Sequence, residues 1–167
     1  MGNVHIFKSS YSKGYLLTTI LLAAFMINIV IGVAHQMAIV PMGTPRFYWM
    51  AFSLVLFSYL VIYSFLSQIV SVNVDDERVI IQKMLGQIVI SRSEIVKVEV
   101  APKSKSTVNL FSLRGLFGSI GWFRNKELGT HFCLVKNDRE KVVVRTARRC
   151  YVVSCDCKEE FVALFSK

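Results

Sequence analysis

The chain has 167 residues, of which 53% are hydrophobic, a mean hydropathy of +0.48 and a formal net charge of +9. All 11 acidic residues and 17 of the 20 basic residues lie after Val70. This division excludes a single soluble domain, because the first part of the chain has the composition of a lipid-facing segment and the second that of a water-facing one.

Two long uncharged segments dominate the first part of the chain. Residues 15–34 carry no charge, and a helix of this length spans about 30 Å, the thickness of a hydrocarbon core. Residues 47–70 are also uncharged and long enough to cross a bilayer with some tilt. The rest of the chain is too short to cover two such helices inside a soluble core. The sequence therefore predicts two transmembrane helices, at 15–34 and 47–70, joined by a short external loop at 35–46.

The basic residues that flank the predicted spans indicate their orientation. Lys8 and Lys13 precede the first span, Arg78 and Lys83 follow the second, and Arg46 alone lies in the loop between them. The positive-inside rule then favours both termini in the cytoplasm. We expect the chain to lie in the cell (inner) membrane as a multi-pass protein. Residues 1–14 are accordingly interpreted as a cytoplasmic N-terminal tail.

One polar side chain inside the spans invites a structural explanation. Asn28 is expected to form a hydrogen bond with Ser58 or Tyr59 across the helix pair, because an amide in lipid needs a partner. Neither predicted span contains the Asp, Glu, Lys or Arg that a proton relay or coupled transporter usually shows.

The pattern changes at Ser71 to the period of two that is typical of β-strands with one buried face. Short strands and turns follow one another as far as Ser154, and Asp156 with Glu159 is expected to cap a final helix. Residues 71–167 are therefore predicted to form a cytoplasmic domain with about seven strands. We expect a bent antiparallel sheet or partly open barrel, closed by a C-terminal helix.

Two motifs in this domain resemble a known family. Residues 114–118 and 121–129, RGLFG and GWFRNKELG, resemble a glycine- and aromatic-rich signature of bacterial pleckstrin-homology (PH) domains. Residues 151–156 and 159–161 resemble the last strand and helix entry of the same family, although Cys155 and Lys158 stand where it often has proline. The resemblance covers most of residues 72–167 and implies a PH fold, frequently preceded by membrane helices. It also implies a membrane-associated binding module, without a settled biochemical activity.

The glycine- and aromatic-rich segment supplies the candidate contacts with a membrane or partner. Aromatic side chains beside cations can enter the headgroup layer while the charges meet anionic lipid phosphates. The alternative is that the aromatic residues only pack on the sheet, and the sequence leaves both interpretations open. The candidate contact residues are Arg114, Phe117, Trp122, Phe123, Arg124 and Lys126.

Other kinds of site find little support in the sequence. PH domains that bind phosphoinositides use basic residues in the first loop, whereas residues 75–77 of this chain are all acidic. Cys155 and Cys157 are too close for the usual zinc knuckle, and Cys133 and Cys150 are expected to be core residues with free thiols. No catalytic motif is found, and we expect no metal and no cofactor.

The leading functional hypothesis is a membrane-tethered, non-catalytic PH-like module that docks on a protein partner, on the anionic inner leaflet or on another copy of itself. An open sheet edge could recruit a strand from a partner. The alternative is a small oligomeric membrane-transport or channel subunit with a cytoplasmic regulatory domain. Nucleic acid is not expected as a partner, because acidic residues are interspersed among the basic ones.

Overall fold

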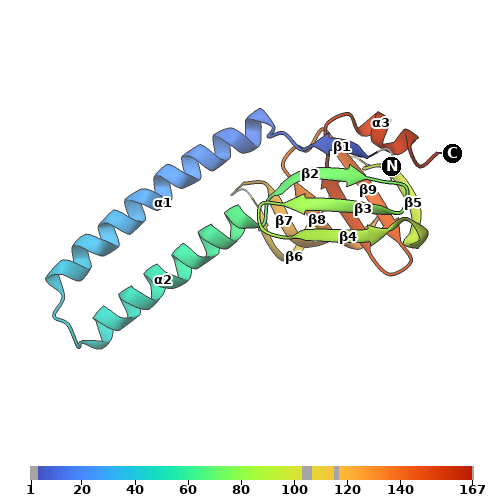
Figure 1. Ribbon diagram of the computed structural model, residues 1–167. Coiled ribbons are helices and arrows are strands. Elements are labelled where there is room, and N and C mark those ends of the chain that lie inside the picture. Colours follow the sequence, from blue (N-terminus) through green and yellow to red (C-terminus); the bar gives the residue numbers. More distant parts are fainter. Residues whose placement is uncertain (1–3, 103–106, 115–116, 167) are drawn as a thin grey trace.

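The computed structural model describes residues 4–102, 107–114 and 117–166, without the side chains of Thr107, Leu113 and Arg114. Two long helices extend in the same direction from a β domain, and both chain ends lie at that domain (Figure 1). The element order is one strand, the two helices, nine further strands and a short C-terminal helix in the described residues.

The two helices are long and apolar enough to cross a membrane. Helix α1 covers Lys13–Ile39 and begins at Ser12, whose hydroxyl accepts a hydrogen bond from the N–H of Tyr15. Helix α2 covers Pro45–Leu66 and begins in the same way at Thr44. No residue of α1 is buried and only Ser64 of α2 is, so their apolar side chains are left uncovered by protein.

The helix bounds differ from the predicted spans of 15–34 and 47–70. The N-cap hydroxyls place both helix starts two residues earlier, and α1 continues for five residues beyond Ala34. Helix α2 ends earlier, at Leu66, because the chain enters strand β2 at Ile69. The partner expected for Asn28 is also different, since its amide donates to the carbonyl oxygen of Ala24 in its own helix, at 2.8 Å.

A four-stranded antiparallel sheet begins with residues from before α1. It has the order β1-β2-β3-β4, formed by His5–Lys8, Ile69–Val74, Arg78–Lys83 and Gln87–Ser91. Strand β1 pairs with β2 along its whole length, from His5 opposite Val74 to Lys8 opposite Ser71. Part of the segment interpreted as a tail is therefore a strand of the domain.

The second sheet has six strands in the order β5-β9-β10-β8-β7-β6. A single 3-10 turn at Arg92–Glu94 connects the two sheets. The strands are Ile95–Val100 (β5), Thr107–Arg114 (β6), Ser119–Asn125 (β7), Gly129–Val135 (β8), Lys141–Thr146 (β9) and Cys150–Ser154 (β10). Strand β10 lies between β8 and β9 and runs parallel to β8, so the sheet is not a pure meander.

The two sheets enclose a core of Val, Ile, Leu and Phe side chains, and the barrel is not closed. Helix α3, Lys158–Ala163, packs on this core through Phe161, whose ring meets Phe7 of β1 edge-on at 5.2 Å. The predicted mainly-β fold with a C-terminal helix is thus confirmed.

The expected capping role of Asp156 is wrong. Cys157, with φ of +62°, occupies the N-cap position of α3 without a side-chain hydrogen bond. The carboxylate of Asp156 instead accepts hydrogen bonds from the backbone N–H and the hydroxyl of Ser10. Asp156 therefore fastens the segment that follows β1 to the end of β10.

Candidate functional site

Phe117, two residues before β7, lies against both helices. The N–H of Phe117 donates to the hydroxyl of Thr19 in α1 at 3.2 Å. The Phe117 ring meets that of Phe65, in the last turn of α2, edge-on at 5.3 Å. Beside them, the hydroxyl oxygens of Tyr15 and Ser119 are 2.8 Å apart. Phe117 is therefore a contact between the β domain and the helix pair.

Two glycines of this segment, Gly118 and Gly121, are required by backbone packing. Gly118 has φ of +122°, and a Cβ there would lie 2.3 Å from the carbonyl oxygen of Val135. Gly121 has φ of +126°, and a Cβ there would lie 2.5 Å from the carbonyl oxygen of Phe111. These are distances that no side chain tolerates, so the two glycines let β7 pack closely on β8 and β6.

Trp122 belongs to an aromatic row that crosses neighbouring strands. Its ring contacts Phe132 at 5.2 Å, and Phe132 contacts Tyr151 at 6.5 Å. On its other side, Trp122 pairs in register with Phe111 of β6, a side chain that is 86% exposed. The row therefore runs from the domain interior to the edge of the six-stranded sheet.

Strand β6 forms that edge and presents apolar side chains to solvent. Val108, Leu110 and Phe111 are all exposed, and in the described part of the chain β6 pairs only with β7. Neither strand contains an acidic residue, and the exposed Arg124 lies opposite Val108. This arrangement combines an unpaired backbone edge, an apolar surface and a positive charge.

Residues 70–167, from the second residue of β2 to the last residue, match the family model described as bacterial PH domain. The chain belongs to the bacterial PH domain family. The match confirms the resemblance carried by the glycine- and aromatic-rich segment, and only β1 among the strands lies outside it. No curated protein and no solved structure matches the chain.

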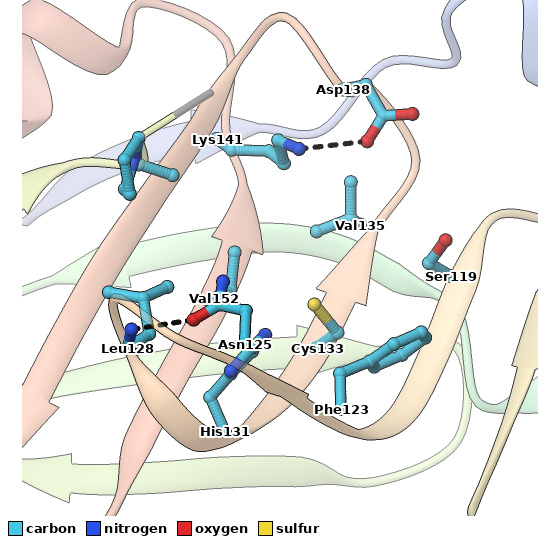
Figure 2. Close-up of a pocket in the computed structure, with 12 residues that line it drawn as sticks. Ser119, Phe123, Asn125, Leu128, His131, Cys133, Val135, Asp138, Lys141 and Val152 are labelled. Atoms are coloured by element: carbon cyan, nitrogen blue, oxygen red, sulfur yellow. Dashed lines mark hydrogen bonds and ion pairs between the residues drawn. The ribbon is translucent and has the colours of Figure 1, made fainter. Parts of the chain in front are cut away.

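Phe123 points to the opposite face of this PH domain. It is fully buried and stacks on His131 at 6.3 Å. Figure 2 shows both rings beside Cys133 at a small cavity of about 60 Å³. A cavity of this size holds a few water molecules and no larger ligand. Among the residues that the structure describes, no group of His, Cys, Asp and Glu could hold a metal ion.

The remaining candidate residues lie apart from the helix contact. Arg124 and Lys126 are exposed, in and just beyond the end of β7 opposite to Ser119. Arg124 lies five steps along the strand from Ser119, which is roughly 17 Å. Arg114 ends β6, and its side chain lies outside the described part. The structure therefore brings Phe117 to the helices and Trp122 and Arg124 to the β6 edge, and it places Phe123 in the core.

The acidic turn between β2 and β3 is held by its own backbone. The carboxylate of Asp75 accepts hydrogen bonds from the N–H groups of Glu77 and Arg78, at 2.9 and 2.6 Å, and pairs with the Arg78 guanidinium. Desolvation raises the pKa of Asp75, but these interactions outweigh it and leave the pKa below its ordinary value. Asp75 thus acts in this PH domain as a turn residue.

A buried polar cluster at the base of the helices was missed by sequence reasoning. Lys136, only 8% exposed, has its ammonium 4.7 Å from the ring centroid of Tyr11, and burial lowers the pKa of Lys136. The Tyr11 hydroxyl donates to the amide oxygen of Gln68. Nearby, the hydroxyls of Ser9 and Ser154 are 2.7 Å apart. The only local signal was the run of short polar residues before the first span.

The cysteines of the PH domain are all free thiols. Cys133 and Cys150 are buried core residues, as predicted. Cys155 is fully buried, and desolvation together with the neighbouring carboxylate of Asp156 raises the pKa of its thiol to about 12. Cys157 alone is exposed. Three of the four thiols are therefore shielded from reagents.

Proposed function

We propose that the chain is a membrane-anchored, non-catalytic binding module whose two helices hold the PH domain at the cytoplasmic face of a cell membrane. The uncovered apolar surface of α1 and α2 supports insertion, because in water it would remain exposed. Pairing of β1 with β2 puts the start of the chain and the domain at the same end of the helix pair. Lys8, Lys13 and Lys83 lie at that end and Arg46 at the other, which favours the cytoplasmic side.

The binding surface that we assign to this module is the β6 edge. The observation that carries the assignment is Phe111, a large aromatic side chain left 86% exposed on a strand that, in the described part of the chain, is paired along one edge alone. An extended segment of a partner protein can add to such an edge through main-chain hydrogen bonds, while its side chains fill the adjoining apolar surface. Because β6 and β7 carry arginines and no acidic residue, we expect a partner segment that combines apolar and acidic side chains.

Photocrosslinking in intact cells tests this surface. A photoreactive residue replaces Phe111 in one variant and Val89, half-exposed on strand β4 at an edge of the other sheet, in the matched control. We expect an adduct of one defined mass at position 111 that is absent at position 89 and is lost when Arg124→Glu is added. No adduct at position 111, the same adduct at both positions, or an adduct with the mass of two copies of this chain would contradict the proposal.

Membrane anchoring has its own test. Alkaline carbonate extraction of membranes is expected to leave the full chain in the pellet, as it does for proteins held by spanning helices. Release of the chain into the supernatant would contradict membrane anchoring. It would leave the proposal that the β6 edge binds a partner unaffected.

A further inference from the structure

The turn between β3 and β4, residues 84–86, is fixed to the end of α2. The N–H of Leu85 donates to the carbonyl oxygen of Leu66, the last residue of α2, at 2.9 Å. The N–H of Met84 donates to the carbonyl oxygen of Gln68, also at 2.9 Å. The last carbonyls of a helix have no donor within the helix, so the turn supplies one of the missing donors. Figure 1 shows this turn on the side of the β domain from which both helices extend.

The end of α2 marks the level of the bilayer surface, and this step rests on the membrane anchoring proposed above. The exposed Tyr63 lies one turn before the end of α2, and Lys13 begins α1 at the same end of the helix pair. Tyrosine and lysine side chains gather at membrane–water interfaces. Three helical steps, about 4.5 Å, separate Tyr63 from Leu66. A bilayer crossed by α2 therefore has its surface within a few ångströms of residues 84–86.

The same turn carries two large apolar side chains, where hairpin turns usually have polar residues or glycine. Met84 is 50% exposed and Leu85 is 65% exposed. Neither belongs to the apolar core formed by the described residues. Their apolar surface is therefore not used to pack the domain, and in water it would stay uncovered.

Charge distinguishes the two ends of the four-stranded sheet. No acidic residue lies between Arg78 and Ser93, and Lys83 stands directly before the turn. The turn at the other end of the sheet, residues 75–77, consists of three acidic residues. Strand β3 separates the two turns by roughly 20 Å. The apolar and basic end of the sheet, which is the end at the helices, thus has the charge that suits an anionic headgroup layer.

We propose that the β3–β4 turn enters the headgroup layer of the bilayer that α2 crosses, with Met84 and Leu85 at the boundary of the acyl chains. Amphipathic segments bury their apolar side chains about 5–10 Å deep at this boundary. The lipid surface is the occupant, because the hydrogen bond from Leu85 to Leu66 joins the turn to the end of the spanning helix. With the two helices, the turn forms a third point of attachment. It fixes the tilt of the β domain and the distance of the β6 edge from the membrane.

The test places a nitrobenzoxadiazole fluorophore on this turn in the full chain. Leu85→Cys and, separately, Met84→Cys are made in a Cys157→Ser background, because Cys157 is the exposed thiol of the chain. The labelled chain is reconstituted into vesicles of phosphatidylcholine and phosphatidylglycerol, in which some of the lipids carry a nitroxide near the top of the acyl chain. We expect quenching at both positions to be at least about threefold stronger than at a control position outside the bilayer, because a label at the acyl boundary meets the nitroxide directly.

Val96→Cys is the matched control, because Val96 is also an aliphatic side chain, 69% exposed, and follows the 3-10 turn at 92–94. The N–H of Arg92 donates to the carbonyl oxygen of Glu77, which fixes that turn beside the acidic end of the sheet. A label at position 96 should emit as in water and be quenched little. Thermal unfolding before reconstitution shows whether the variants fold, and if the variant at position 85 does not, the one at position 84 decides the outcome.

Three outcomes would overturn the proposal: equal quenching at positions 85 and 96, quenching at neither, or a blue-shifted emission at position 85 that the nitroxide lipids do not quench. The last would show that a protein surface, such as that of a second copy, covers the turn. Alkaline carbonate extraction of the same vesicles distinguishes a failure of anchoring. A chain released into the supernatant contradicts both proposals, whereas a chain that stays in the pellet with an unquenched turn contradicts this inference alone.

Discussion

The backbone N–H of Phe117 and the hydroxyl of Thr19 are joined by a 3.2 Å hydrogen bond across 98 residues of chain. In Thr19→Val the amide of Phe117 loses its acceptor, at a cost of about 0.5–1.5 kcal/mol to the contact between the domain and α1. We expect faster hydrogen exchange at the amides that follow Phe117, measured by mass spectrometry on the solubilised chain. Thr18→Val is the control, because the Thr18 hydroxyl donates to the carbonyl oxygen of Gly14 in its own helix. Equal exchange in the two variants would contradict the coupling.

Gly118→Ala tests the close packing of β7 on β8. The new Cβ would meet the Val135 carbonyl oxygen at 2.3 Å in a backbone conformation with φ of +122°. We expect a loss of at least about 2 kcal/mol in the free energy of unfolding. Gly129→Ala has a positive φ but no atom within 4 Å, so its smaller effect measures backbone strain alone. Similar midpoints for the two variants in chemical denaturation would show that the structure adjusts to the new Cβ at position 118 with little loss in the free energy of unfolding.

Phe7→Ala tests whether the segment before α1 belongs to the domain core. Phe7 is buried against Phe161, and its truncation is expected to cost roughly 3–5 kcal/mol. Ile6→Ala, one residue earlier, removes a side chain that is 64% exposed and should change stability by less than about 0.5 kcal/mol. Denaturant unfolding, followed by tryptophan fluorescence, measures the free energy of unfolding of both variants. An unchanged free energy in Phe7→Ala would mean that β1 does not contribute to the stability of the domain.

The β6 edge should tolerate change without loss of stability. Phe111→Ser alters an exposed side chain and is expected to shift the free energy of unfolding by less than about 0.5 kcal/mol. Phe123→Ala, on the neighbouring strand, removes a buried ring and should cost roughly 3–5 kcal/mol. A large destabilisation by Phe111→Ser would show that the ring supports the fold and is not free for a partner.

Thiol labelling should separate the four cysteines by burial and by pKa. At pH 7.5 a maleimide is expected to label Cys157 alone, and Cys157→Ser should abolish the signal. A separate pH dependence follows from the buried thiol of Cys155. The pKa of this thiol is raised to about 12 in the folded chain, from an ordinary value near 9. Its burial therefore contributes stability that is complete below about pH 9 and is lost progressively towards pH 12. Labelling of Cys155 at neutral pH by intact protein would contradict its placement.

Hydrophobic patterning alone was enough to predict the two apolar helices and most strands of the domain. Uncharged runs and period-two alternation are local properties of the chain, and turns such as residues 75–77 are marked by their own residues. Strands β6 and β7 were missed as strands because glycines and a bulge near Leu110 interrupt their alternation. Strand β1 was missed because its partner, β2, is separated from it by both helices.

The candidate site was predicted in part. The glycine- and aromatic-rich segment identified the family and contained Phe117 and Trp122, which the structure places at the helix contact and beside the β6 edge. Which aromatic ring faces which side depends on register, and a shift of one residue would have exchanged Trp122 and Phe123. The cluster around Lys136 and Tyr11 could not be predicted, because it joins residues more than a hundred positions apart.

The pairing of β1 with β2 has a consequence for how the chain is made. Strand β1 precedes α1 and strand β2 follows α2, so their pairing joins the two ends of the helix hairpin. The two strands can pair only after both helices have been synthesised, because β2 follows α2 in the chain. A shortened chain that begins at the family boundary would lack β1, which leaves the edge of β2 bare and removes the Phe7 ring from Phe161. Such a fragment would be prone to aggregate through that edge.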